Sequence, residues 1–150
     1  MITISNIRLV DKNDYDEVWA IVRKNKDNDF KQVLELAPSK ELFSWYYQHR
    51  DEWSKELFIE EYYPRFIEEF TQEGKNKLKE LRQLDKENKN ICLVCFCFDE
   101  TICHRSIIAG ILQGMGCNVK TDTGNDYSSY YKDFLKIHGK KKGNWYVISY

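Results

Sequence analysis

Cys103, His104 and Arg105 stand next to one another directly after a short acidic turn, and each offers a different chemistry. The turn follows the apolar run ICLVCFCF, which ends at Phe98, and the apolar spacing after the turn predicts a helix. The first turn of a helix has unpaired N–H groups and a partial positive charge, so it attracts anions. Open α/β sheets also bind ligands at the carboxyl ends of their strands. The pattern therefore predicts a ligand site at this strand-to-helix turn.

Four residues of the turn are candidates for catalysis. A thiol at a helix N-terminus ionises more easily than a free thiol, whose pKa is about 8.5, so we expect Cys103 to act as a nucleophile. His104 can take up or release a proton near neutral pH, and Asp99 and Glu100 supply carboxylates. The alternative is structural. Cys103 would then be a small buried side chain, and His104 would cap the helix or pair with the acidic turn.

Three further residues are candidates for binding an anion. Arg105 carries a planar guanidinium that can hold two phosphate or carboxylate oxygens, and Ser106 follows it in the predicted helix. Arg23 lies at the end of a predicted strand and reaches the same crevice if the two strands are neighbours; otherwise it is a surface arginine. We expect Arg105→Ala to weaken anion binding and to leave the fold nearly intact.

Several well-known catalytic patterns are missing from the sequence. Gly110, Gly114 and Gly116 lie along or beyond the predicted helix and not ahead of it, so they form no phosphate-binding glycine loop. The sequence also contains no His-Glu-x-x-His and no recognisable Ser/His/Asp order. The turn that carries Cys103 is therefore the most informative feature of the chain.

The five cysteines lie between residues 92 and 117, and their odd number argues against a secreted disulfide scaffold. We interpret them as reduced intracellular thiols. Cys95, Cys97, Cys103 and His104 together offer four ligands for zinc or iron. Structural zinc ligands usually come in two pairs, however, and sequence neighbours such as Cys103 and His104 rarely converge on one ion. We expect no metal and no cofactor, and a packing role for Cys92 and Cys95 in a buried strand.

Strand and helix patterns alternate along the chain. Apolar and β-branched runs predict strands over residues 1–10, 17–24, 91–98, 117–120 and 144–150. Helical spacing predicts helices over residues 40–53, 55–72, 75–89 and 105–115, with Ser39 as an N-cap and Pro64 as a kink. A strand, a turn, a helix and a strand within about 30 residues form a βαβ signature. We therefore predict an α/β fold with a mostly parallel sheet and flanking helices in a Rossmann-like, three-layer arrangement.

Length and composition limit the class of protein. The 150 residues, with 42% hydrophobic and 31% charged side chains, suit one domain over residues 1–150, and residues 121–143 have the polar, basic character of an insertion. The net charge of −1 gives no reason to expect a polyanionic partner. No apolar run approaches the ~20 residues that span a membrane, and the N-terminus lacks a secretory signal pattern. We expect a cytoplasmic protein without membrane contact.

The motif Leu36-Ala37-Pro38-Ser39, the tyrosine-rich helical middle and the stretch CLVCFCFDETICHRSIIAGIL resemble the domain of unknown function 488 family. Its members are small bacterial and phage proteins in which a hydrophobic strand, an acidic turn and Cys-His-Arg open a helix. The resemblance covers residues 1–120 and implies an α/β domain with a shared pocket. It implies no settled reaction.

Three functions remain open from the sequence. The first is an enzyme that acts on a nucleotide, nucleoside or nucleobase, through an N-glycosidic or phosphate-linked substrate; this preference rests on analogy of fold. The second is a module that captures such a ligand, or a nucleic-acid end, without converting it. The third is nucleic-acid binding by Lys140, Lys141 and Lys142 beside tyrosines of the C-terminal part. The sequence is also compatible with a homo-oligomer.

Overall fold

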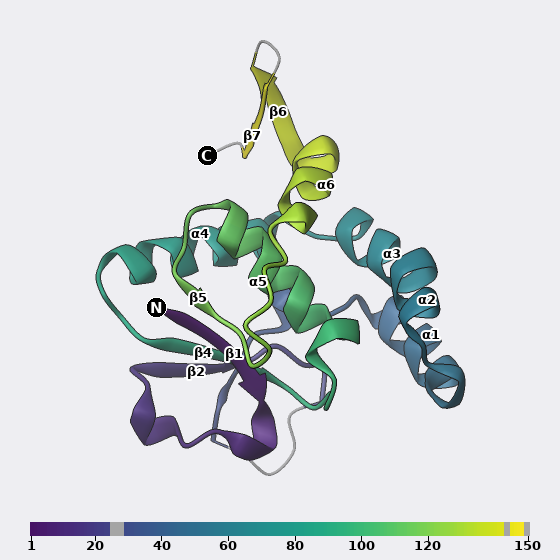
Figure 1. Ribbon diagram of the computed structural model, residues 1–150, viewed down its shortest axis with the longest axis horizontal. Helices are drawn as coiled ribbons and strands as arrows, with labels where there is room; N and C mark the ends of the chain where they lie inside the picture. Colours follow the sequence, from purple (N-terminus) through teal and green to yellow (C-terminus); the bar gives the residue numbers. More distant parts are fainter. Residues whose placement is uncertain (25–28, 143–144, 149–150) are drawn as a thin grey trace.

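A five-stranded, all-parallel sheet forms the centre of the protein (Figure 1). The computed structural model describes residues 1–24, 29–142 and 145–148, and from residue 141 onward only their backbone. The strands lie in the order β3-β2-β4-β1-β5, and their bounds are β1 Ile2–Asn6, β2 Glu17–Ala20, β3 Lys31–Gln32, β4 Ile91–Cys95 and β5 Val119–Lys120. The predicted α/β fold with a mostly parallel sheet is confirmed.

β4 is the central strand, and it is buried along its whole length, as its uninterrupted apolar run predicts. It pairs with β1 on one side and with β2 on the other. The strand ends at Cys95 and does not continue to Phe98, which is 83% exposed. The carbonyl of Cys97 accepts a hydrogen bond from the side chain of Arg105 instead of pairing with a strand.

The structure contains helices in each of the four predicted helical regions, and one more near the C-terminus. Their bounds are α1 Lys40–His49, α2 Lys55–Leu57, α3 Tyr63–Glu68, α4 Gln72–Lys86, α5 His104–Gly114 and α6 Ser129–His138. The hydroxyl of Ser39 accepts a hydrogen bond from the backbone N–H of Leu42, which confirms Ser39 as the N-cap of α1. Pro64 lies in the first turn of α3, directly after a π-helical turn over Phe58–Tyr62. The missing N–H of the proline is accommodated by this change of hydrogen-bond spacing instead of a break.

The chain leaves β2 and β4 in opposite directions along the sheet. β2 continues to β3 at one edge, whereas β4 continues through α5 to β5 at the other edge. In Figure 1, α4 and α5 lie above the strands and the short connection from β1 to β2 lies below them. Because β2 and β4 are neighbours, their carboxyl ends frame the kind of crevice in which parallel sheets bind ligands. The neighbouring strands that Arg23 needs in order to reach this crevice are present.

The C-terminal part packs on α5 and then leaves the sheet. The polar segment after residue 121 contains α6, a helix that the sequence patterns do not predict, and Phe134 anchors it in the core. β6 (Gly139–Lys142) and β7 (Trp145–Ile148) pair with each other in an antiparallel ribbon, visible at the top of Figure 1. The predicted last strand therefore forms outside the parallel sheet. Within the described residues, no helix combines the length and apolar character needed to cross a membrane.

Two glycines of α5 allow this C-terminal segment to approach. A Cβ at Gly110 would overlap the backbone carbonyl of Tyr127, and one at Gly114 would overlap the side chain of Tyr131. We predict that Gly110→Ala lowers the free energy of unfolding by ~1–3 kcal/mol in urea denaturation, because a backbone carbonyl must move. Lys136→Ala, on the exposed face of α6, should change it by less than about 0.5 kcal/mol. Equal effects of the two substitutions would contradict this packing.

Candidate functional site

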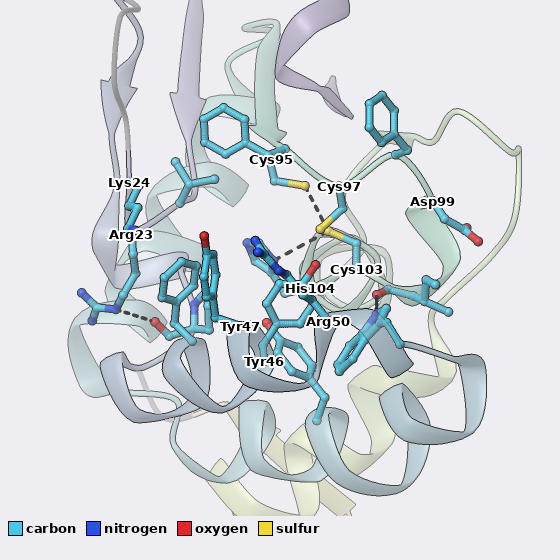
Figure 2. A pocket seen from close by; sticks show the side chains of 18 residues that line it. Arg23, Lys24, Tyr46, Tyr47, Arg50, Cys95, Cys97, Asp99, Cys103 and His104 are labelled. Carbon is cyan, nitrogen blue, oxygen red and sulfur yellow. Dashed lines mark hydrogen bonds between the residues drawn. The ribbon is translucent and has the colours of Figure 1, made fainter.

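A cavity of about 540 Å³ opens at the carboxyl ends of β2 and β4 (Figure 2). The chain after β2 contributes Arg23 and Lys24 to its lining, and the end of β4 with the following turn contributes Cys95, Cys97 and Asp99. The start of α5 and the face of α1 close the remaining sides. The cavity therefore lies where the strand-to-helix turn predicts a ligand site.

α1 supplies an aromatic wall. Phe43, Tyr46, Tyr47 and Arg50 line the cavity at spacings of three and four residues, which places them on one face of a helix. Trp53 completes the wall and packs edge-on against Tyr46, with ring centroids 4.7 Å apart. The sequence analysis does not single out Arg50, although its spacing from the three aromatic residues is a signal that could identify this face.

Three cations and one carboxylate line the cavity. The guanidinium of Arg23 donates from Nε to the Pro38 carbonyl at 2.8 Å, which holds its side chain at the crevice. Lys24 and Arg50 both lie over the ring of Tyr47, at 5.3 Å and 4.2 Å from its centroid. Asp99 accepts hydrogen bonds from the backbone N–H and the hydroxyl of the next residue but one, so its carboxylate caps the turn. The balance of charge favours an anionic ligand.

A cluster of cysteine and histidine forms the floor of the cavity. The sulfur atoms of Cys95 and Cys103 are 3.0 Å apart, and the Cys103 sulfur lies 3.7 Å from Nδ1 of His104. All three side chains are buried within the fold and yet line the cavity. The structure thus brings Cys103 and His104 together with a second thiol, Cys95, to which the sequence analysis assigns only packing.

The hydrogen bonds of His104 determine its tautomer. Nε2 lies 2.6 Å from the carbonyl oxygen of Ile21, and a carbonyl can only accept, so Nε2 carries the proton. Burial lowers the pKa of His104, which leaves the ring neutral near pH 7. Nδ1 therefore has a free lone pair that faces the Cys103 sulfur. His104 can accept a proton from this thiol.

The hydrogen bonds of the cluster favour an ionised thiol at Cys95. The guanidinium of Arg105 donates to the Cys95 sulfur at 3.1 Å. Burial alone raises the pKa of Cys95, but hydrogen bonds from the thiols of Cys103 and Cys97, with a smaller contribution from the charge of Arg105, lower it below its usual value. Burial and the adjacent Cys95 raise the pKa of Cys103 well above its usual value. This direction is opposite to the expectation that Cys103 ionises easily, because the charged neighbour lies beside the other sulfur.

Arg105 and Ser106 do not line the cavity. Arg105 is 0% exposed, and besides Cys95 its guanidinium donates to the carbonyls of Cys97 and Phe98. The hydroxyl of Ser106 donates to the carbonyl of Cys103 inside the first turn of α5. The burial of Arg105 leads us to expect that Arg105→Ala destabilises the fold instead of leaving it nearly intact, because the substitution leaves buried acceptors unpaired.

Glu100 holds a loop together away from the cavity. Its buried carboxylate accepts hydrogen bonds from the backbone N–H of Asp122 and from the hydroxyls of Thr123 and Tyr127. Of the two acidic residues of the turn, only Asp99 lines the cavity. This bonding gives Glu100 the role of an anchor for residues 122–127.

Cys95, Cys103 and His104 are the described residues whose ligand atoms lie closest together for a metal ion, all within 4.8 Å. Two thiolates on one tetrahedral zinc, at ~2.3 Å each, would lie about 3.8 Å apart. The separation of 3.0 Å is shorter, and the positive charge of Arg105 lies against one of the two sulfurs. This geometry favours a pair of thiols over a metal centre.

The basic C-terminal residues lie apart from the cluster. Lys140 is exposed on β6, and the side chains of Lys141 and Lys142 lie outside the described residues. Tyr127 and Tyr130 stack on each other, and Tyr127 is buried, so its ring is not free to stack on a base.

We predict that Arg105→Met lowers the free energy of unfolding by ~2–4 kcal/mol, because the buried acceptors and the thiolate lose their partner. Arg8→Met is a matched control, since Arg8 also donates to a carbonyl of this segment, that of Phe96, but is exposed. Arg8→Met should lower the free energy of unfolding by less than about 1 kcal/mol, measured by urea denaturation. If Arg105→Met lowers the free energy of unfolding by no more than Arg8→Met does, the stabilising role of the buried guanidinium is contradicted.

The effect of Arg105→Met should also depend on pH. The pKa of Cys95 is lower in the folded protein than in the unfolded chain, where it is about 8.5, so the thiolate stabilises the fold fully above that pH. This stabilisation is lost as the pH falls through the lower, folded pKa. We expect the stability difference between wild type and Arg105→Met to narrow on acidification, measured by denaturation in a pH series. A constant difference would argue against a thiolate.

Comparison with known proteins places the chain in a family. Residues 5–116 match a family model described as the active DUF488-N3 subclade. No curated protein and no solved structure matches the chain. The match includes the strand β4, the Cys-His cluster and the whole of α5, and it ends before the C-terminal segment that packs on α5. Since it covers well over half of the residues, this chain belongs to the domain of unknown function 488 family, in its active N3 subclade.

Proposed function

We propose that the protein binds a nucleotide, or a nucleoside carrying a phosphate, in the cavity between β2 and β4, and that the Cys-His cluster reacts with it. The observation that carries this proposal is the lining of the cavity. Aromatic rings, three cations and a cluster of two thiols and a histidine face one space of about 540 Å³. This volume lies within the range of small-molecule sites, ~300–1,000 Å³.

The aromatic wall supports binding of a flat ring. Tyr47 is 47% exposed and Tyr46 is partly buried beside it, so rings of α1 are within reach of a ligand. The indole of Trp53 is fixed by a hydrogen bond from Nε1 to the carbonyl of Ile102, at 3.1 Å. A base stacked on such a wall gains ~1–3 kcal/mol.

The cations support binding of a phosphate. Arg23 follows β2 and Arg50 follows α1, so two separate elements each bring a guanidinium to the cavity. These guanidiniums take over the anion-binding role that the sequence assigns to Arg105, which is held inside the fold. A guanidinium binds phosphate oxygens through two parallel hydrogen bonds.

The cluster supports a reaction at the floor of the cavity. The Cys95 thiolate is a nucleophile, and the Cys103 thiol can donate the proton that a leaving group needs. Nδ1 of His104 can reprotonate or deprotonate Cys103 across 3.7 Å. The description of the matched family model as active agrees with a catalytic role.

We predict that Arg23→Gln and Arg50→Gln each weaken nucleotide binding about tenfold, or ~1.4 kcal/mol, because each removes a charged contact to phosphate. Binding is measured by calorimetry with a panel of nucleotides and nucleosides on the reduced protein. Lys136→Gln removes an equal charge from the exposed face of α6 and should bind as the parent does. Identical affinity in all three variants, or no binding by any member of the panel, would refute the proposal.

A second arm of the experiment separates catalysis from capture. The same panel is incubated with the protein, and products are followed by mass spectrometry. We expect conversion of at least one compound by the parent, and none by Cys95→Ser with binding retained within about threefold. Tight binding without any product would instead favour a module that captures the ligand.

A further inference from the structure

We propose that Cys95 and Cys103 form a reversible disulfide when the protein meets a hydroperoxide. This inference goes beyond the proposed function, because it needs no nucleotide. It concerns a second reaction of the same two sulfur atoms.

The two sulfurs are positioned for a bond. They are 3.0 Å apart, so a movement of about 1 Å brings them to the 2.03–2.05 Å of a disulfide. Cys95 ends β4 and Cys103 is the N-cap residue of α5, and only the turn between these elements separates them along the chain. A small adjustment of this turn can therefore close the bond.

The neighbours of the two sulfurs give them different roles. The Cys95 sulfur accepts from the buried guanidinium of Arg105, which favours the thiolate that attacks a peroxide. The Cys103 sulfur lies beside the unprotonated Nδ1 of His104, which can remove its proton in the next step. A pair made of one thiolate and one thiol with an adjacent base is the arrangement that disulfide formation requires.

The reaction balances in two steps. The Cys95 thiolate attacks one peroxide oxygen, the O–O bond breaks, and the products are a sulfenic acid on Cys95 and an alkoxide that takes a proton from solvent. The Cys103 sulfur then attacks the Cys95 sulfur and displaces the oxygen, while His104 transfers the Cys103 proton to it. The sulfurs lose two electrons to the peroxide, which leaves as an alcohol and water. A dithiol such as dithiothreitol reverses the change by thiol–disulfide exchange.

The cavity brings a peroxide near some of the cysteines and not near the others. Cys95, Cys97 and Cys103 line it, so a small peroxide that enters the cavity comes close to all three. A hydrogen bond with Cys103 lowers the pKa of Cys97, but hydrogen bonding to Cys95 and burial outweigh it and raise that pKa to about 12, whereas the Cys95 sulfur accepts from Arg105. Cys92 and Cys117 do not line the cavity, and burial raises their pKa to about 12 and about 11. Oxidation should therefore be selective. The pair also contains the nucleophile of the proposed function, so a disulfide would switch that chemistry off.

The experiment treats the reduced, full-length protein with an equimolar amount of hydrogen peroxide in the absence of any nucleotide. We expect the alkylatable thiols to fall from five to three, and peptide mapping to join Cys95 to Cys103. Dithiothreitol should restore all five. Cys103→Ser should stop at the sulfenic acid on Cys95, and Cys95→Ser should consume peroxide at least about tenfold more slowly. Cys92→Ser and Cys117→Ser should behave as the parent does, with circular dichroism verifying the fold of each variant.

Three results would overturn the inference. They are no loss of thiols, a disulfide that joins another pair such as Cys95 and Cys97, and a stoichiometric metal ion in the purified protein that protects these thiols. Nucleotide binding by the reduced protein is a separate measurement. If the reduced protein binds no nucleotide, the proposed disulfide is unaffected. If no disulfide forms, the proposed nucleotide binding is unaffected.

Discussion

The structure around the cavity depends on one buried positive charge. The guanidinium of Arg105 lies inside the fold, and among the described residues the one carboxylate within 4.0 Å of it is Asp122, at 3.9 Å. Its close partners are the Cys95 sulfur and the carbonyl of Cys97. A guanidinium cannot lose its proton at ordinary pH, so burial requires a compensating negative charge. A thiolate at Cys95, whose sulfur lies 3.1 Å from the guanidinium, is the closest group that can supply it. The same hydrogen bonds end β4 at Cys95 and turn the chain toward α5, which gives the floor of the cavity its shape.

The location of this floor follows from the topology of the sheet. β2 and β4 are neighbours whose chains leave in opposite directions, which opens a crevice between their carboxyl ends. α1 fills part of that space with aromatic rings, and the chain after β2 adds cations. The reactive sulfur therefore faces an enclosed, partly apolar space, in which a charge interacts more strongly than it does in water. The buried guanidinium therefore acts on the cavity through the Cys95 sulfur, since Arg105 does not itself line the cavity.

The sequence predicts the position of the site better than it predicts the roles within it. The apolar run of β4, the acidic turn and the apolar spacing of α5 are local patterns, so the strand, the helix and the crevice can be expected from them. The burial of Arg105 cannot be expected from them. The local sequence of a helix N-terminus is the same whether its arginine faces solvent or the core. For that reason the sequence favours Cys103 as the reactive thiol, whereas the buried guanidinium beside the Cys95 sulfur favours Cys95. Arg50 is missed because the orientation of α1 is set by packing between elements far apart in the chain.

The chemistry proposed for the cavity depends on which of the two neighbouring sulfurs, Cys95 or Cys103, is ionised. Nuclear magnetic resonance can measure the ionisation of each thiol directly. In protein labelled with carbon-13 at the cysteine Cβ, the Cβ shift reports whether each thiol is ionised as the pH changes. We predict that Cys95 remains a thiolate below the ordinary thiol pKa near 8.5 and that Cys103 remains a thiol above it. Ionisation of Cys103 before Cys95, or of Cys95 at the ordinary value, would contradict this prediction.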